Sequence, residues 1–124
     1  MPTSKAFFVQ RLNDHIQYLG KVTNTLKGQG DFQGTNCHQC KLGTWIDNEG
    51  THAIAHSSPA LQQQFAELVA KHELFHDFSN EALAKHQTGD HLNSRRAMTE
   101  MHKLSSQLVN LLLSMDRQAH QQAA

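Results

Sequence analysis

The chain has 124 residues, in which eleven lysine and arginine residues balance eleven aspartate and glutamate residues, and histidine occurs ten times. A chain of this length has room for one domain with a single hydrophobic core. The zero formal net charge argues against nucleic acid or a membrane surface as a partner, because neither would be attracted by a balanced surface.

The N-terminal apolar stretch is too short for a secretory signal, and no later stretch is long enough to span a bilayer. We therefore expect a cytoplasmic protein. In a reducing compartment, two cysteines are more often metal ligands or reactive thiols than a structural disulfide.

Residues 4–27 predict an amphipathic helix, because apolar positions recur there with gaps of three and four. The positions that form this seam are Phe8, Leu12, His15, Leu19, Val22 and Leu26. His15 therefore occupies a position at which a core side chain is expected. Gly28 and Gly30 are expected to end the helix.

Residues 28–58 form an irregular segment in which residues 44–47 are expected to form a short helix. Loops of this length inside a small domain usually carry a function. Cys37 and Cys40 of this segment form a C-x-x-C pair. A thioredoxin-type pair needs a strand followed by a helix, and a zinc ribbon needs a second C-x-x-C pair. Neither is present, so we expect at most one of the two thiols to bind a metal directly.

A long helix is expected to begin at Ser58 and Pro59, with the serine as its N-cap and the proline at its first helical position. Its apolar stripe comprises Leu61, Phe65, Leu68, His72 and Phe75, with His76 and Leu83 alongside. Gly89 and Asp90 are expected to end this helix and to cap the last one.

The last helix is expected from about His91 to beyond Met115, with a frayed tail after about residue 117. Its core positions are predicted to be Ala97, Met101, Leu104, Leu108, Leu111 and Met115. The chain as a whole predicts one all-α domain over residues 1–124. We expect an up-and-down four-helix-type bundle whose long loop between helices one and two carries a metal ligand.

The C-terminal part of the last helix is apolar on more than one face. If the core takes Leu108, Leu111 and Met115, then Val109, Leu112 and Leu113 remain partly exposed. An exposed apolar patch of this kind is uncommon in a monomer, so the pattern predicts a homodimer. The alternative is that helix one and the long loop cover these side chains within the monomer.

Three histidines and a cysteine predict a metal site. His72 and His76 are four residues apart on a helix, so they point to the same side and can bind one ion. His15 and His72 both occupy core positions, where an imidazole without a strong partner costs on the order of 1–3 kcal/mol. Metal coordination satisfies them together. Imidazoles and one thiolate suit Zn²⁺.

The segment from His72 to His76 also matches the zinc-protease motif H-E-x-x-H, in which Glu73 would be the general base acting on a zinc-bound water. The extended form of the motif is not matched, since Ser79 and Ala82 stand at its diagnostic positions. No strand is predicted that could align a peptide substrate. We therefore expect no enzymatic activity and keep a zinc hydrolase as the alternative.

The segment Cys40-Lys41-Leu42-Gly43-Thr44-Trp45 resembles the motif of the chemoreceptor zinc-binding (CZB) domain, a cysteine followed by an aliphatic residue or Phe, then Gly, then Trp or Tyr. Further family positions are similar in the same order: His15 with Tyr18, the pair His72 and His76, and Gly89 with Asp90. The resemblance implies a helical bundle that binds one Zn²⁺ through His15, Cys40, His72 and His76. It leaves Cys37 as an additional thiol.

The resemblance also implies a sensory role, because such domains usually accompany a chemoreceptor signalling region or a diguanylate cyclase and report zinc or an oxidant such as hypochlorous acid. We therefore expect a stand-alone zinc-binding regulatory domain. Zinc level or oxidation of the ligand cysteine would change the bundle and signal to a separate partner of one of these types. A passive zinc buffer or carrier is a further alternative, which would bind a partner equally with and without metal.

Overall fold

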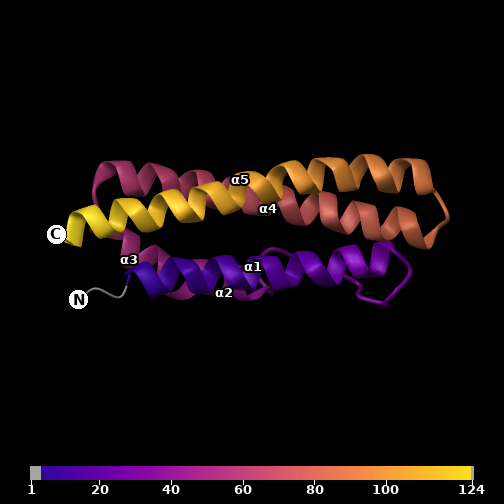
Figure 1. The fold of residues 1–124 in the computed structure, drawn as a ribbon, viewed down its shortest axis with the longest axis horizontal. Helices are drawn as coiled ribbons and strands as arrows, with labels where there is room; N and C mark the ends of the chain where they lie inside the picture. The colour runs from indigo at the N-terminus through magenta and orange to yellow at the C-terminus, as the bar shows by residue number, and fades with distance from the viewer. Residues whose placement is uncertain (1–3, 124) are drawn as a thin grey trace.

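The computed structural model describes residues 4–123, with side chains described for residues 8–120. These residues form helices and contain no strand. The elements are α1 (Ser4–Leu26), α2 (Lys41–Trp45), the π-helical turn η1 (Ile46–Gly50), α3 (Thr51–Ala55), α4 (Pro59–Gln87) and α5 (His91–Ala123). The long helices α1, α4 and α5 run alongside one another (Figure 1) and pack together in pairs. The all-α fold class predicted from the sequence is confirmed.

The fourth helix of the bundle is formed by the three short elements between residues 41 and 55. The residues at their junctions, Trp45, Ile46, Gly50 and Thr51, all have right-handed helical backbone angles, so the helix continues through the π turn. This segment packs on α1 at its start and on α4 at its end. The short helix expected at residues 44–47 is therefore part of a longer one.

The N-terminal ends of α4 and α5 lie where the sequence predicted them. Ser58 caps α4, because its hydroxyl oxygen accepts the Leu61 N–H at 3.2 Å, and Pro59 follows at the first helical position. Asp90 caps the N-terminus of α5, because its carboxylate accepts the Asn93 N–H at 3.3 Å. These caps satisfy backbone donors that have no partner within the helix.

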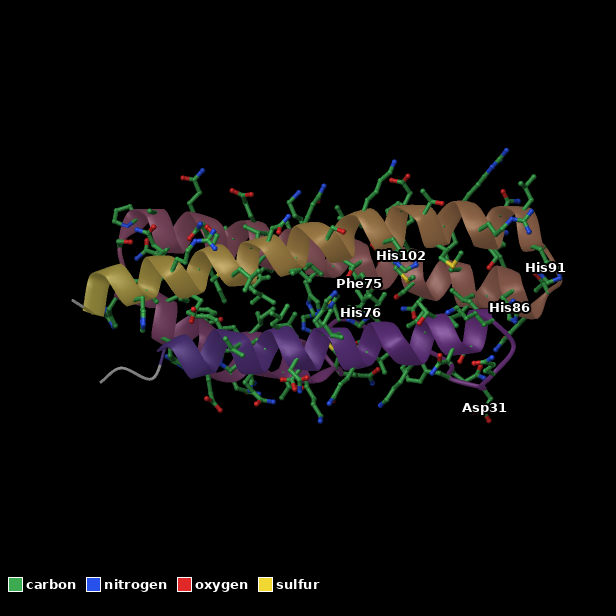
Figure 2. The ribbon with its side chains drawn as sticks, viewed as in Figure 1. Asp31, Phe75, His76, His86, His91 and His102 are labelled. Atoms are coloured by element: carbon green, nitrogen blue, oxygen red, sulfur yellow. The ribbon has the colours of Figure 1, made fainter. Side chains whose placement is uncertain are left out.

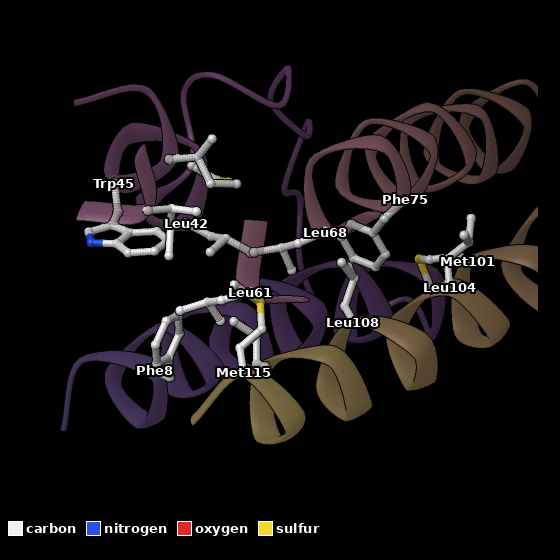
Figure 3. Close-up of a cluster of buried hydrophobic side chains, with 14 of the residues drawn as sticks. Phe8, Leu42, Trp45, Leu61, Leu68, Phe75, Met101, Leu104, Leu108 and Met115 are labelled. Carbon is white, nitrogen blue, oxygen red and sulfur yellow. The ribbon is translucent and has the colours of Figure 1, made fainter. Parts of the chain in front are cut away.

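The apolar core runs along the bundle and holds α2 in place. Figure 3 shows Leu42 and Trp45 of α2 in one cluster with Phe8 and Leu61. The Trp45 ring meets the ring of Phe8 edge to face, with centroids 6.0 Å apart. Burial of such side chains stabilises a fold by about 1.5–3 kcal/mol each. The helix that follows Cys40 is thus fixed against α1 and α4.

One expectation about α5 is wrong. Its core seam passes through Leu112, which is 1 % exposed, and not through Leu111, which is half-buried. The step from Leu108 to either leucine fits a helical repeat, so spacing alone did not distinguish them. Helix α5 continues to Ala123, and Ala119 packs into the core, whereas fraying of the tail stays a prediction.

Among the residues that the structure describes, no helix combines the length and the apolar character that crossing a bilayer requires.

Candidate metal centre

Cys40, His72 and His76 converge in the interior of the bundle. One potential ligand atom from each lies within 4.8 Å of the others, and all three side chains are buried. Cys40 Sγ is 3.2 Å from His72 Nε2. A tetrahedral zinc ion with Zn–S of about 2.3 Å and Zn–N of about 2.0–2.1 Å separates its ligand atoms by about 3.3–3.6 Å. The Cys40–His72 distance is close to this spacing, and the three donors together could hold one ion. A thiol with two imidazoles is a donor set that suits zinc.

Cys40 is fixed at the N-terminus of α2. It is the N-cap residue of that helix, and its Sγ accepts the Gly43 N–H at 3.2 Å. A side chain at position 43 would overlap the carbonyl oxygen of Cys37, so only glycine allows the turn at residues 37–40 to pack on α2. A helix N-terminus also favours the negatively charged form of a thiol. The spacing from Cys40 to Gly43 thus has a local structural reason.

His72 and His76 lie one turn apart on α4, with ring centroids 4.7 Å apart. His76 Nδ1 is 3.0 Å from the carbonyl oxygen of Thr35. Because a carbonyl can only accept, Nδ1 carries the proton and Nε2 keeps its lone pair. A hydrogen bond from the second ring nitrogen to a carbonyl is the usual way in which a metal-binding histidine is oriented.

Thr35 connects the loop to two helices. Its carbonyl oxygen also accepts a hydrogen bond from Asn80 Nδ2 at 2.9 Å, and its own N–H donates to the Tyr18 hydroxyl at 2.9 Å. The Tyr18 ring in turn packs against the His76 ring, with centroids 4.7 Å apart. Gly34 precedes with φ +84°, and a side chain there would overlap the amide oxygen of Asn80. The loop is therefore fixed between α1 and α4.

His15 is buried on α1 but is not a member of the group of three. Its Nε2 is 2.9 Å from the Ser105 hydroxyl of α5, and its ring meets the Phe75 ring edge to face at 4.7 Å. When Ser105 accepts the Nε2 proton, Nδ1 is the nitrogen left to bind a metal. The role of His15 as the fourth ligand stays a prediction.

Burial sets the protonation of these groups. It lowers the pKa of His72 to about 3, and the neighbouring His76 and His15 add to the effect. It lowers the pKa of His15 to about 4, again with a contribution from His76. Burial raises the pKa of the Cys40 thiol, which the backbone N–H groups of Gly43 and Leu42 partly offset. At neutral pH the imidazoles are neutral and ready to bind, whereas the thiol must release its proton.

The remaining histidines lie away from the interior. Six of them are exposed, and His86 is half-buried. Figure 2 shows His76 and Phe75 between the helices in the middle of the bundle, while His86 and His91 lie at its far end near the α4–α5 turn. Most of the ten histidines are therefore too far from the interior to bind the same ion.

Cys37 and Glu73 lie near the centre without belonging to the group of three. Cys37 is partly exposed and Glu73 is exposed, and neither Cys37 nor Cys40 is in a disulfide. Burial raises the pKa of the Cys37 thiol, and the negative charge of Glu73 adds to that. Cys37, Glu73 and His76 line one surface cavity.

Sequence reasoning missed three residues that support the centre. Nothing in the sequence distinguishes Ser105 from the other polar residues of α5. Thr35 acts through its backbone carbonyl and N–H, and a pattern of side chains does not reveal such a role. Asn80 did offer a signal, because it stands four residues after His76 and so shares its helix face.

The structure is a helical bundle with a buried cluster of one cysteine and two histidines that could hold a metal ion. The family model of the chemoreceptor zinc-binding domain matches residues 15–83, which is more than half of the chain. The chain belongs to this family. The matched segment begins at His15 and contains Cys40, His72 and His76, whereas Gly89, Asp90 and α5 lie outside it. Comparison with curated proteins and with solved structures gave no match.

Proposed function

We propose that the chain is a zinc-responsive regulatory domain that binds one Zn²⁺ through Cys40, His72, His76 and His15. The observation that carries this proposal is the convergence of three buried donors from the loop and from α4 within 4.8 Å. The family match supports zinc as the metal. The neutral state of the buried imidazoles supports the same conclusion, because only neutral imidazole binds a metal.

The ligands belong to different elements, so metal binding links them. Cys40 precedes α2, His72 and His76 are on α4, and His15 is on α1. The loop is held near the centre by the contacts of Thr35 with Tyr18, His76 and Asn80, and by the contact of Cys40 Sγ with His72 Nε2. Bound zinc would add bonds from Cys40 to α4 and α1, so metal occupancy would change how firmly these elements are held to one another.

The signal is either the zinc level or oxidation of Cys40. Bound zinc would hold Cys40 as a thiolate, which is the form that oxidants attack. Oxidation of the sulfur toward sulfenic acid weakens it as a ligand and releases the loop. Both inputs thus produce the same change.

The output is a separate signalling protein in the cytoplasm, of chemoreceptor or diguanylate cyclase type, and the domain acts as a homodimer. Exposed apolar side chains on adjacent helices support the dimer. Val9 and Ile16 of α1 are 47 % and 46 % exposed, and Leu113 of α5 is 38 % exposed. Helices α1 and α5 pack on each other, so these side chains belong to neighbouring helices. A passive zinc buffer, by contrast, would not need an exposed apolar surface for a partner.

Metal content and hydrogen exchange test the proposal. We expect about one zinc per purified chain, retained in Cys37→Ser and lost in Cys40→Ser. Removal of zinc should speed amide exchange at residues 34–45 and should change it less at the buried centre of α5. A wild-type chain without zinc would contradict the metal assignment. Equal exchange with and without zinc would contradict the regulatory role and favour a buffer.

A further inference from the structure

Two surface cavities reach the candidate metal centre, and the loop at residues 35–40 contributes to both. The first, here called the His76-side cavity, has a volume of about 390 Å³ and is lined by His76 together with Cys37, Glu73 and Asp77. The second, the Cys40-side cavity, has a volume of about 160 Å³ and is lined by Cys40 together with Asp14, Lys21 and Lys41. Each cavity therefore touches one of the three donors.

The two cavities carry opposite charge. Two carboxylates and a thiol line the His76-side cavity, and no lysine or arginine does. Two lysines line the Cys40-side cavity. Its one carboxylate, Asp14, is buried and lies 3.5 Å from Arg11 Nε, so its charge is largely compensated. A cation is thus attracted to one cavity and repelled from the other.

The His76-side cavity is lined by a buried candidate metal ligand as well as by acidic side chains. The residue is only 2 % exposed, yet it lines this cavity and belongs to the group of three donors. Its Nδ1 is occupied by the Thr35 carbonyl, so the nitrogen that binds metal is Nε2. The carboxylates of Glu73 and Asp77 therefore line the same cavity as a buried candidate ligand.

We infer that the His76-side cavity is the entrance through which a divalent cation reaches the centre, with Glu73, Asp77 and Cys37 as the groups that first receive it. Carboxylate oxygens and a thiol are groups that can replace water molecules around a zinc ion. This inference rests on the proposed function. It gives Glu73 and Cys37 a role without placing either among the final ligands.

The rate of zinc uptake tests the role of charge. Metal-free protein is mixed with Zn²⁺, and the fluorescence of the single tryptophan, Trp45, is followed in a stopped-flow instrument. We expect the double variant Glu73→Gln/Asp77→Asn to take up zinc about tenfold more slowly at low salt, with the difference shrinking at 0.5 M salt. The matched control Glu67→Gln/Glu81→Gln removes the same charge from exposed positions of α4 outside both cavities. It should leave the rate unchanged.

A steric block tests the route itself. Ala70 is exposed and lines the His76-side cavity, whereas Ala66, one turn earlier on α4, is exposed and does not. We expect Ala70→Phe to slow zinc uptake and zinc release by the same factor, because a narrowed entrance hinders both directions and leaves the dissociation constant unchanged. Ala66→Phe should change neither rate.

The outcomes separate this inference from the function on which it rests. Wild-type rates for both the double variant at low salt and Ala70→Phe, with one zinc bound per chain, would overturn the entrance and leave the zinc site standing. A wild-type chain that binds no zinc would overturn both.

Discussion

Nδ1 of His76 lies 3.0 Å from the carbonyl oxygen of Thr35, so a backbone atom of the long loop orients a histidine of α4. The same carbonyl accepts a hydrogen bond from Asn80, which stands one turn further along that helix. The loop and the helix therefore hold each other, and the hydrogen bond fixes the ring orientation of the candidate ligand. This arrangement lowers the cost of organising the site when a metal arrives.

The first prediction concerns Asn80. In Asn80→Ala the Thr35 carbonyl loses one of its two donors, and the loop is held less firmly against His76. We expect zinc affinity to fall about tenfold, at the lower end of the effect of losing an outer partner of a metal ligand. Competition with a chelator measures it. Glu81→Ala, at the neighbouring exposed position, is the control. An unchanged affinity would mean that the loop is held by its other contacts alone.

The second prediction concerns His15 and Ser105. If His15 binds the metal through Nδ1, Ser105→Ala removes the partner of Nε2 and should lower zinc affinity by about 10–100-fold. His15→Ala should lower it further, because a ligand itself is lost. Ser106→Ala, one residue on and exposed, should have no effect. If His15 is only a hydrogen-bonded core residue, both His15→Ala and Ser105→Ala will bind zinc as the wild type does.

The third prediction is that the metal-free protein loses stability on acidification below about pH 6.5. The folded pKa values of His15 and His72 are lowered to about 4 and about 3, from 6.5. As the pH falls below 6.5, the unfolded chain binds protons that the folded chain does not, so the free energy of unfolding decreases. The loss continues until the pH reaches the folded pKa of each histidine, and it amounts to about 1.4 kcal/mol per pH unit for each one.

Urea denaturation in the presence of a chelator, repeated between pH 7 and pH 4.5, measures this loss. His15→Leu should have a shallower pH dependence, whatever its stability at pH 7, because one titrating group is gone. A free energy of unfolding that is constant down to pH 5 would contradict the buried neutral state of these imidazoles.

The fourth prediction is that Glu73→Gln binds one zinc per chain and that neither this variant nor the wild type hydrolyses peptides. Glu73 is exposed, and a fourth protein ligand leaves no position on the metal for water. Assays with a casein substrate and with zinc-loaded protein measure the activity. Turnover by the wild type that disappears in Glu73→Gln with zinc retained would support the hydrolase alternative.

The sequence was sufficient for those features that depend on local patterns. The cap at Ser58, the turn at Gly89 and the shared helix face of His72 and His76 each follow from a few neighbouring residues, and the structure confirms them. The features that it missed depend on contacts between distant segments. His15 and Ser105 are 90 residues apart, and His76 and Thr35 are 41 apart. No spacing rule along the chain predicts such a pair.

The core seam of α5 shows a different limit. Leu111 and Leu112 both fit a helical repeat that begins at Leu108, so the pattern alone could not decide which of them faces the core. The choice depends on how α5 is rotated against α1 and α4. The structure buries Leu112, and this changes the surface through which a dimer can form.

The last prediction is that the chain forms a homodimer through the neighbouring helices α1 and α5, which carry Val9, Ile16 and Leu113. Burial of each such side chain is worth about 1.5–3 kcal/mol before the costs of association are subtracted. Leu113→Glu should raise the dissociation constant of the dimer at least tenfold and leave zinc bound, because no candidate ligand is on α5. Leu112→Glu should instead unfold the chain, since it places a carboxylate in the core at a cost of several kcal/mol. Light scattering and circular dichroism separate the two effects. A wild-type species of 13.9 kDa at micromolar concentration would reject the dimer.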